Sequence, residues 1–154
     1  MIVKKIWLFL GVPLAVGGLA ALLAGGMGTY DNFAQPPLSP PGWVFPVVWT
    51  ILYLAMGYAS WRVYSRGADA GQVRLSLVFY GLQLFLNFLW PIVFFKFQAF
   101  LAAFVVLIAL WIAIVVTLWQ FYKSDERAGD LLIPYLLWVT FAGYLNLGVY
   151  LLNG

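Results

Sequence analysis

Five long apolar stretches, separated by short polar segments, run through the 154 residues of this chain. At a rise of ~1.5 Å per residue, a helix of about 20 residues crosses the hydrocarbon core of a bilayer. The pattern therefore predicts an all-α fold, an integral membrane bundle of five transmembrane helices that forms one domain over residues 1–154. The expected spans cover residues 6–27, 44–64, 75–95, 99–122 and 127–152.

The longest segment between two expected spans, residues 28–43, is rich in proline. Pro36-Pro37 and Pro40-Pro41 exclude a helix interior, because proline lacks the backbone N–H and clashes with the preceding turn. Such a segment stays extended and has little conformational freedom left to lose. We therefore expect residues 28–43 to form a stiff lid over the start of the second span.

Two further features concern the ends of spans. The basic start and apolar run of residues 1–27 resemble a signal peptide, but the run exceeds the 7–15 residues usual for one, which favours a span. Within it, Gly17, Ala21 and Gly25 form a stripe of small residues, for which packing inside the monomer is the preferred interpretation over a dimer contact. At the last span, Ser124-Asp125-Glu126 predicts a helix start with a capping serine.

Composition agrees with a membrane protein and excludes several chemistries. Residues are 65% hydrophobic and only 8% charged, against about 25% charged in soluble domains. The absence of Cys and His excludes thiol nucleophiles, disulfides, His general bases and the usual zinc and haem ligands. No metal site and no required cofactor are expected, and no motif supports hydrolysis or phosphoryl transfer.

Basic residues are unevenly divided between the two ends of the expected bundle. Only Lys96 lies on one side, whereas seven basic residues lie on the other: Lys4, Lys5, Arg62, Arg66, Arg74, Lys123 and Arg127. By the positive-inside rule, the N-terminus is expected in the cytoplasm and the lid outside, for insertion into an inner membrane. The positive net charge thus reports topology, and no nucleic-acid partner is expected.

Three spans carry aromatic and polar residues at helical spacing, so that each set lies on one face of its helix. These sets are Trp49, Tyr53, Met56 and Gly57; Gln83, Asn87, Trp90 and Phe94; and Pro134, Trp138, Ala142 and Asn146. Amides deep in a span should point inward, because an unsatisfied amide in hydrocarbon costs several kcal/mol.

Two interpretations of these sets remain. The amides either orient a flat hydrophobic ligand in an aromatic cavity under the lid, or they only join helices, at about 0.6 kcal/mol each. For Trp7, Trp61 and Trp119, near span ends, interfacial anchoring is preferred. For Trp49 and Trp138 we prefer the ligand site.

With these residues in place, the chain resembles the TspO/MBR family, the tryptophan-rich sensory proteins of bacteria and the mitochondrial translocator protein, or peripheral benzodiazepine receptor. The resemblance covers most of the chain beyond the first span. The matching residues are Tyr30, Pro36, Pro40-Pro41, Trp43, Val48-Trp49, Leu52-Tyr53, Gln83, Asn87, Trp90, Phe94-Phe95, Pro134-Tyr135, Trp138, Ala142, Leu145 and Asn146.

The resemblance implies a five-helix membrane receptor or sensor, commonly a homodimer, that binds porphyrins such as protoporphyrin IX and benzodiazepine-site ligands and regulates tetrapyrrole traffic or signalling. It places the ligand-binding pocket at Tyr30, Trp49, Tyr53, Asn87, Trp90, Trp138, Ala142 and Asn146. It also implicates Trp49 and Trp138 as catalytic residues if the protein degrades porphyrin in light.

The chain departs from the family pattern in the lid, where Leu38 replaces a frequent Trp and Gln35 a frequent Lys. No Lys or Arg follows Tyr144 or Tyr150, so the cholesterol pattern of animal members is absent and cholesterol binding is not expected. Alongside binding, two alternatives stay open: light-dependent porphyrin degradation, and transport of porphyrin or lipid-like ligands. The span interiors lack the ionisable groups and the sequence lacks the repeats that are typical of transporters.

Overall fold

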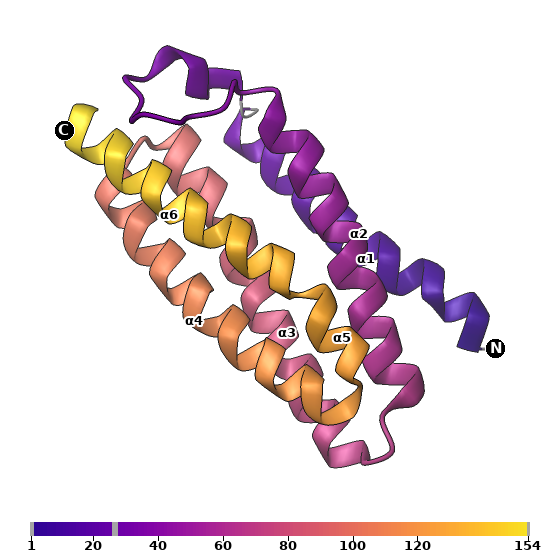
Figure 1. Cartoon of the computed structure of the whole chain (residues 1–154). Coiled ribbons are helices and arrows are strands. Elements are labelled where there is room, and N and C mark those ends of the chain that lie inside the picture. The colour runs from indigo at the N-terminus through magenta and orange to yellow at the C-terminus, as the bar shows by residue number, and fades with distance from the viewer. Residues whose placement is uncertain (1, 26–27, 154) are drawn as a thin grey trace.

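The computed structural model describes residues 2–25 and 28–153. Its elements, in chain order, are α1 (Ile2–Ala24), η1 (Gly28–Asn32), α2 (Val44–Arg66), α3 (Ala70–Pro91), η2 (Ile92–Lys96), α4 (Phe100–Ser124), α5 (Glu126–Leu131) and α6 (Ile133–Asn153) (Figure 1). Five stretches of the described chain are long and apolar enough to cross a membrane: Lys5–Ala24, Val44–Arg66, Ala70–Lys96, Phe100–Ser124 and Glu126–Asn153. The predicted all-α fold with five spans is thereby confirmed. The predicted end of the first span, at residue 27, lies outside the described residues, as does the side chain of Lys4.

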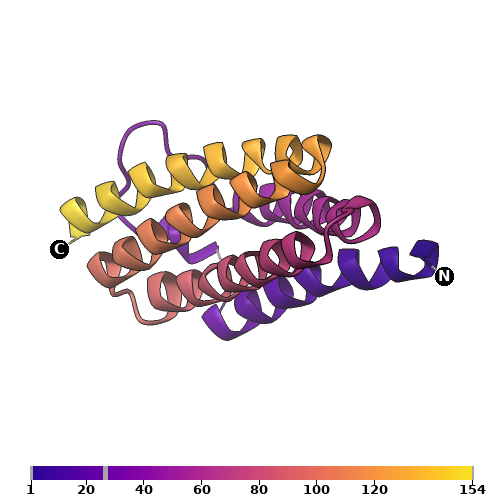
Figure 2. The same cartoon turned by 90° about the horizontal axis from the view of Figure 1, so that it is seen from below.

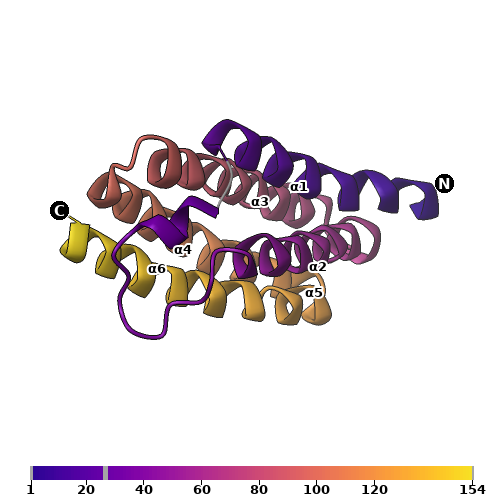
Figure 3. The ribbon, with the colours of Figure 1, turned by 90° about the horizontal axis from the view of Figure 1, so that it is seen from above.

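The helices form an elongated bundle in which α3 packs between α1 and α4, and α4 packs against α6 (Figures 2 and 3). Helix α2 packs on α1 and α5. The connections α2–α3 and α4–α5 lie at one end of the bundle (Figure 1). The segment 28–43, the connection between α3 and α4, and the C-terminus lie at the other end, so the proline-rich segment does cover one mouth of the bundle.

Helix α1 approaches α2 closely at a point that combines a proline and a glycine. Pro13 has no N–H to donate, so the carbonyl of Phe9 is left without its helical partner. A Cβ atom added at Gly57 would lie 2.6 Å from that carbonyl oxygen, which means that only glycine permits this approach. The buried residues of α1 follow the same face, at Pro13, Gly17, Ala20 and Ala24.

The third span changes its helical form at Pro91, where α3 ends and Ile92–Lys96 continues as one wide π-helical turn. One sequence expectation needs correction at a helix end. The capping role predicted for Ser124 is wrong, because Ser124 is the last residue of α4 and Asp125 occupies the N-cap position of α5. Asp125 is extended at φ −159° and its side chain makes no capping bond, since its carboxylate binds a residue of α2 instead.

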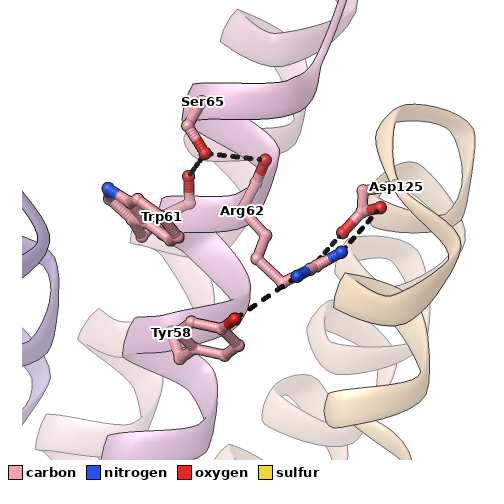
Figure 4. A network of polar contacts seen from close by, with 5 residues as sticks. All are labelled: Tyr58, Trp61, Arg62, Ser65 and Asp125. Atoms are coloured by element: carbon pink, nitrogen blue, oxygen red, sulfur yellow. Dashed lines mark hydrogen bonds and ion pairs between the residues drawn. The ribbon is translucent and has the colours of Figure 1, made fainter. Parts of the chain in front are cut away.

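That residue is Arg62, which the sequence presented only as one of the basic residues at span ends. Its Nε donates to Asp125 Oδ2 at 2.5 Å and its Nη2 to Oδ1 at 3.4 Å (Figure 4). Nη1 also donates to the hydroxyl of Tyr58 at 3.3 Å. With the Arg62 side chain 7% exposed and that of Asp125 15% exposed, the pair is largely shielded from water and joins α2 to the α4–α5 corner.

We predict that Arg62→Met lowers the free energy of unfolding by about 3 kcal/mol, because removal of one partner strands a shielded carboxylate. Arg66→Met is the matched control, since Arg66 lies one turn further on, is exposed and has no ion-pair partner among the described residues. Thermal unfolding in detergent micelles, followed by circular dichroism, measures both. Equal midpoints for the two variants would contradict the assigned role of the pair.

Candidate functional site

A chain of four hydrogen bonds crosses the middle of the bundle and joins α2, α3 and α6. The hydroxyl of Tyr53 donates to Asn87 Oδ1 at 2.9 Å, and Asn87 Nδ2 donates to the hydroxyl of Tyr135 at 2.6 Å. The Tyr135 hydroxyl in turn donates to Gln83 Oε1 at 2.6 Å, and Gln83 Nε2 lies 4.0 Å from the sulfur of Met56. All five side chains are buried. The prediction that Gln83 and Asn87 face the bundle interior is therefore confirmed.

A second polar contact lies nearer the lid. Trp90 Nε1 donates to Asn146 Oδ1 at 2.9 Å, and Asn146 Nδ2 donates to the backbone carbonyl of Phe100 at 2.8 Å. Asn146 thus uses both ends of its amide to join α3, α6 and the start of α4. Trp90 and Asn146 are 4% and 0% exposed, so both predicted site residues lie in the interior.

Aromatic rings fill the space between this contact and the lid. Tyr30, from the lid, packs its edge against Phe45 of α2 at 4.8 Å between ring centroids and is stacked with Phe94 at 6.4 Å. Phe33, also from the lid, packs against Phe94 at 5.9 Å and against Phe100 at 5.1 Å. The lid therefore inserts two of its own rings into the mouth of the bundle.

Hydrogen bonds inside the lid hold Tyr30 in this position. Its hydroxyl lies 2.9 Å from Ser39 Oγ, and its carbonyl accepts a bond from Gln35 Nε2 at 2.9 Å. Burial raises the pKa of the Tyr30 hydroxyl above its ordinary value, so the group stays protonated at neutral pH. Leu38, exposed at the tip, has a left-handed φ of 70°, a strained conformation for a residue with a branched side chain.

The lid is fastened to α6 by side chains near the end of that helix. Tyr144 donates to the carbonyl of Pro37 at 2.7 Å. The amide of Asn153 pairs with the backbone of Ala34, accepting from its N–H at 3.1 Å and donating to its carbonyl at 2.8 Å. These contacts lie at the rim of the bundle, where they are exposed. They hold the lid against α6 but are not themselves buried in the core.

Trp49 and Trp138 differ from the other polar side chains in this region. The indole of Trp49 is stacked with Tyr53 at 5.7 Å and packs edge-on against Tyr135 at 6.1 Å. Trp138 packs against Phe45 at 5.9 Å and against Phe141 at 5.7 Å. Both Nε1 atoms are buried, and neither has a hydrogen-bond partner within the described part of the chain.

The structure thus brings together six of the eight predicted ligand-binding residues in two layers. The outer layer surrounds a cavity of only about 10 Å³ and contains the predicted residues Tyr30, Trp90, Ala142 and Asn146. The inner layer contains Tyr53 and Asn87. Trp49 lies beside the inner layer, and Trp138 lies beside Phe45 of the outer layer. Neither tryptophan lines this cavity, which in this conformation is too small for a ligand.

Sequence reasoning left two contributors out of the site. Tyr135 is the central residue of the hydrogen-bond chain, and Phe45 separates Tyr30 from Trp138. A signal for Tyr135 existed, because Tyr135, Ala142 and Asn146 follow i, i+7, i+11 on one face of a helix. A signal for Phe45 existed as well, because Phe45 precedes Trp49 and Tyr53 at i, i+4 and i+8 on the same helical face.

The sequence of the chain is similar to those of a known protein family. The pattern of the TspO/MBR family matches residues 9–152, which is nearly the whole chain. The chain belongs to the TspO/MBR family. Two bacterial members are similar over 124 residues, 80% of this chain. The tryptophan-rich protein TspO of Chlorobaculum tepidum is 42% identical with 78% of its length covered, and the tryptophan-rich sensory protein of Cereibacter sphaeroides is 41% identical with 76% covered.

Similarity extends to animal members of the TspO/MBR family. The translocator protein of Bos taurus is 34% identical over 138 residues, which cover 88% of this chain and 82% of that protein. Family membership and the five candidate spans together establish an integral, multi-pass membrane protein. The cytoplasmic position of the N-terminus stays a prediction.

We predict that Gly17→Ala disturbs the site from outside it. A Cβ atom at Gly17 would overlap the ring of Tyr53, a rigid side chain that the Asn87 bond holds in place. Gly18→Ala is the control, because a Cβ atom there meets nothing within 4 Å and the gain in helix propensity is the same. We expect Gly17→Ala to be less stable than Gly18→Ala by about 1–3 kcal/mol. Matching unfolding midpoints in micelles would show that Tyr53 is not held in this position.

Proposed function

We propose that this TspO/MBR protein is a membrane receptor or sensor for a flat, apolar ligand of the porphyrin class, such as protoporphyrin IX. The ligand would bind between the lid, residues 28–43, and the aromatic residues of α2, α3 and α6. Benzodiazepine-site ligands, which are also flat and aromatic, would share the site. In this role the protein would regulate tetrapyrrole traffic or signalling. The relative in Cereibacter sphaeroides is named a tryptophan-rich sensory protein.

The observation that carries the proposal is the pair of buried indole N–H groups of Trp49 and Trp138. A buried donor without an acceptor costs about 1–3 kcal/mol, and in hydrocarbon no water compensates for it. Around both indoles lie ring faces and edges, which suit the flat surface of a conjugated ligand. A ligand that brings carboxylate or pyrrole acceptors relieves the cost of both donors when it binds.

Binding in this region requires the lid to move. Ligand sites of this class measure about 300–1,000 Å³, whereas the cavity beneath the lid measures about 10 Å³. Displacement of Tyr30 and Phe33 from the mouth of the bundle would supply the missing space, since both rings belong to the lid. The rim contacts through Tyr144 and Asn153 are exposed hydrogen bonds, which open at low cost in free energy.

Metal coordination has no part in this proposal, because the chain contains no His or Cys. Recognition then depends on stacking, shape and the indole donors. The two alternatives from the sequence, light-driven porphyrin degradation and ligand transport, stay predictions. Degradation would be tested by illumination of the bound porphyrin in the tryptophan variants below, and transport by porphyrin uptake into liposomes.

We predict that purified protein in micelles binds protoporphyrin IX and its iron complex with dissociation constants within about threefold of each other. Trp49→Phe and Trp138→Phe keep an aromatic ring but remove one N–H donor, and each is expected to weaken binding about fivefold, equivalent to ~1 kcal/mol. Trp7→Phe is the control, because Trp7 is 74% exposed at the far end of α1. The porphyrin absorbance shift measures all four proteins without using tryptophan fluorescence.

Two results would contradict the proposal. Strict dependence of binding on iron would show that metal coordination dominates, although the chain lacks the usual ligands. An unchanged affinity in the Trp49→Phe/Trp138→Phe double variant would show that the ligand binds elsewhere.

A further inference from the structure

A pocket of about 330 Å³, named here the α2/α5 pocket, lies between α2 and the corner of α5 and α6. It belongs to the end of the bundle opposite the lid (Figure 1). Arg62, in its wall, precedes the last residue of α2 by four residues, ~6 Å along the helix axis, which is the depth of lipid headgroups. The walls combine an aromatic ring, two bases, one acid and two apolar side chains: Tyr58, Arg62, Arg127, Asp130, Leu131 and Pro134.

Arg62 brings unused hydrogen-bond donors to the α2/α5 pocket. A guanidinium group has five N–H groups. Three of them are engaged, by Nε and Nη2 on Asp125 and by Nη1 on the hydroxyl of Tyr58 (Figure 4). The second N–H of each Nη has no acceptor within the described part of the chain. Because Arg62 is largely buried, an acceptor bound in the pocket would satisfy donors that water reaches poorly.

Two further side chains add donors to the same pocket. Arg127 is exposed, and no hydrogen bond or ion pair occupies its guanidinium among residues 2–25 and 28–153. The hydroxyl of Tyr58 accepts from Arg62 at 3.3 Å, which leaves its own hydrogen free to donate. Guanidinium groups match the spacing of two phosphate oxygens, so this set of donors suits a phosphate.

One acid in the wall restricts which phosphate fits. Asp130 is exposed and lines the pocket, and its Oδ1 accepts from the hydroxyl of Tyr122 at 2.5 Å. Its Oδ2 has no partner in the part of the chain that the structure describes. A carboxylate beside two guanidinium groups opposes a ligand that is only anionic. It favours a ligand with an ammonium group next to its phosphate.

Toward the middle of the bundle, the surface below the polar groups is apolar. Leu131 and Pro134 close the pocket on this side. Leu54 precedes Tyr58 by four residues and Leu137 follows Pro134 by three, so each lies one turn further in on the same helical face. Leu54 and Leu137 are 42% and 65% exposed. They offer an apolar surface to acyl chains attached to the phosphate.

We propose that the α2/α5 pocket binds the headgroup of one phosphatidylethanolamine molecule. The phosphate would accept hydrogen bonds from Arg62 and Arg127, and the ammonium group would donate to Asp130. The acyl chains would lie along Leu54 and Leu137. Phosphatidylcholine fits less well because its quaternary ammonium group has no N–H to donate, and phosphatidylglycerol because it has no ammonium group. The bound lipid would brace α2 against α5, beside the ion pair that already joins them.

Native mass spectrometry of the full chain tests this proposal, with protein taken from micelles that contain equal amounts of dioleoyl phosphatidylethanolamine, phosphatidylglycerol and phosphatidylcholine. We expect one retained phosphatidylethanolamine per chain, favoured over both other lipids. Arg127→Gln should reduce this retention about fivefold, the effect of one basic residue at a lipid surface. Arg66→Gln is the matched control, since Arg66 is an exposed base at the same end of the bundle but outside the pocket.

A second variant tests recognition of the ammonium group. Asp130→Asn keeps an acceptor for Tyr122 but removes the charge, and it should lower the preference for phosphatidylethanolamine over phosphatidylglycerol about threefold. Glu126→Gln is the control, because Glu126 is an exposed acid of α5 that does not line the pocket. Unfolding midpoints in micelles establish that each variant is folded.

Equal retention of the three lipids would overturn the proposal, as would phosphatidylethanolamine retention that is insensitive to both Arg127→Gln and Asp130→Asn. Displacement of the lipid by excess O-phosphoethanolamine would overturn it in favour of a soluble ligand. A chain that retains no lipid but changes its oligomeric mass with Arg127→Gln would overturn it in favour of a second copy of the chain. None of these results bears on porphyrin binding under the lid.

Discussion

The structure depends on one constraint: in hydrocarbon, every polar side chain must find its partner inside the protein. Tyr53, Asn87, Tyr135 and Gln83 meet this constraint together, each donating to the next across three helices. A change at any one of them strands at least one of its neighbours, so the relative positions of α2, α3 and α6 are fixed as a unit. The bond from Trp90 to Asn146 satisfies two further buried polar side chains, nearer the mouth of the bundle. Apolar packing alone would allow these helices to slide or rotate.

The indole N–H groups of Trp49 and Trp138 are exceptions, since they are buried and find no hydrogen-bond partner among residues 2–25 and 28–153. They adjoin a region that the lid fills with its own rings, and the lid is attached by hydrogen bonds at its rim. A closed lid over a closed site separates two tasks. The rigid polar chain below keeps the helices in place, while the aromatic layer above would exchange lid rings for ligand rings in the proposed function. Such an arrangement suits a receptor, because ligand binding then changes the position of a segment at the membrane surface.

Much of this was predictable from sequence. Hydropathy predicted five spans, and helical spacing predicted that Gln83, Asn87 and Trp90 face inward, because both signals are local and periodic. The pairing of Arg62 with Asp125 was not predictable, since it joins residues 63 positions apart that separately serve as a topology signal and a helix start. The packing of Tyr30 against Phe45, which leaves little space beneath the lid, was also missed. Residue spacing predicts which face a ring occupies, but not whether the lid above is open or closed.

The most direct test of the account holds the lid in place. The chain contains no cysteine, so Ala34→Cys with Asn153→Cys introduces a single pair, at positions where the Asn153 side chain now bonds the Ala34 backbone. Porphyrin affinity is then measured with the pair oxidised and after reduction. The account predicts that oxidation abolishes binding and that reduction restores it, because the aromatic site is accessible only when residues 28–43 move. Equal affinity in both states would contradict it.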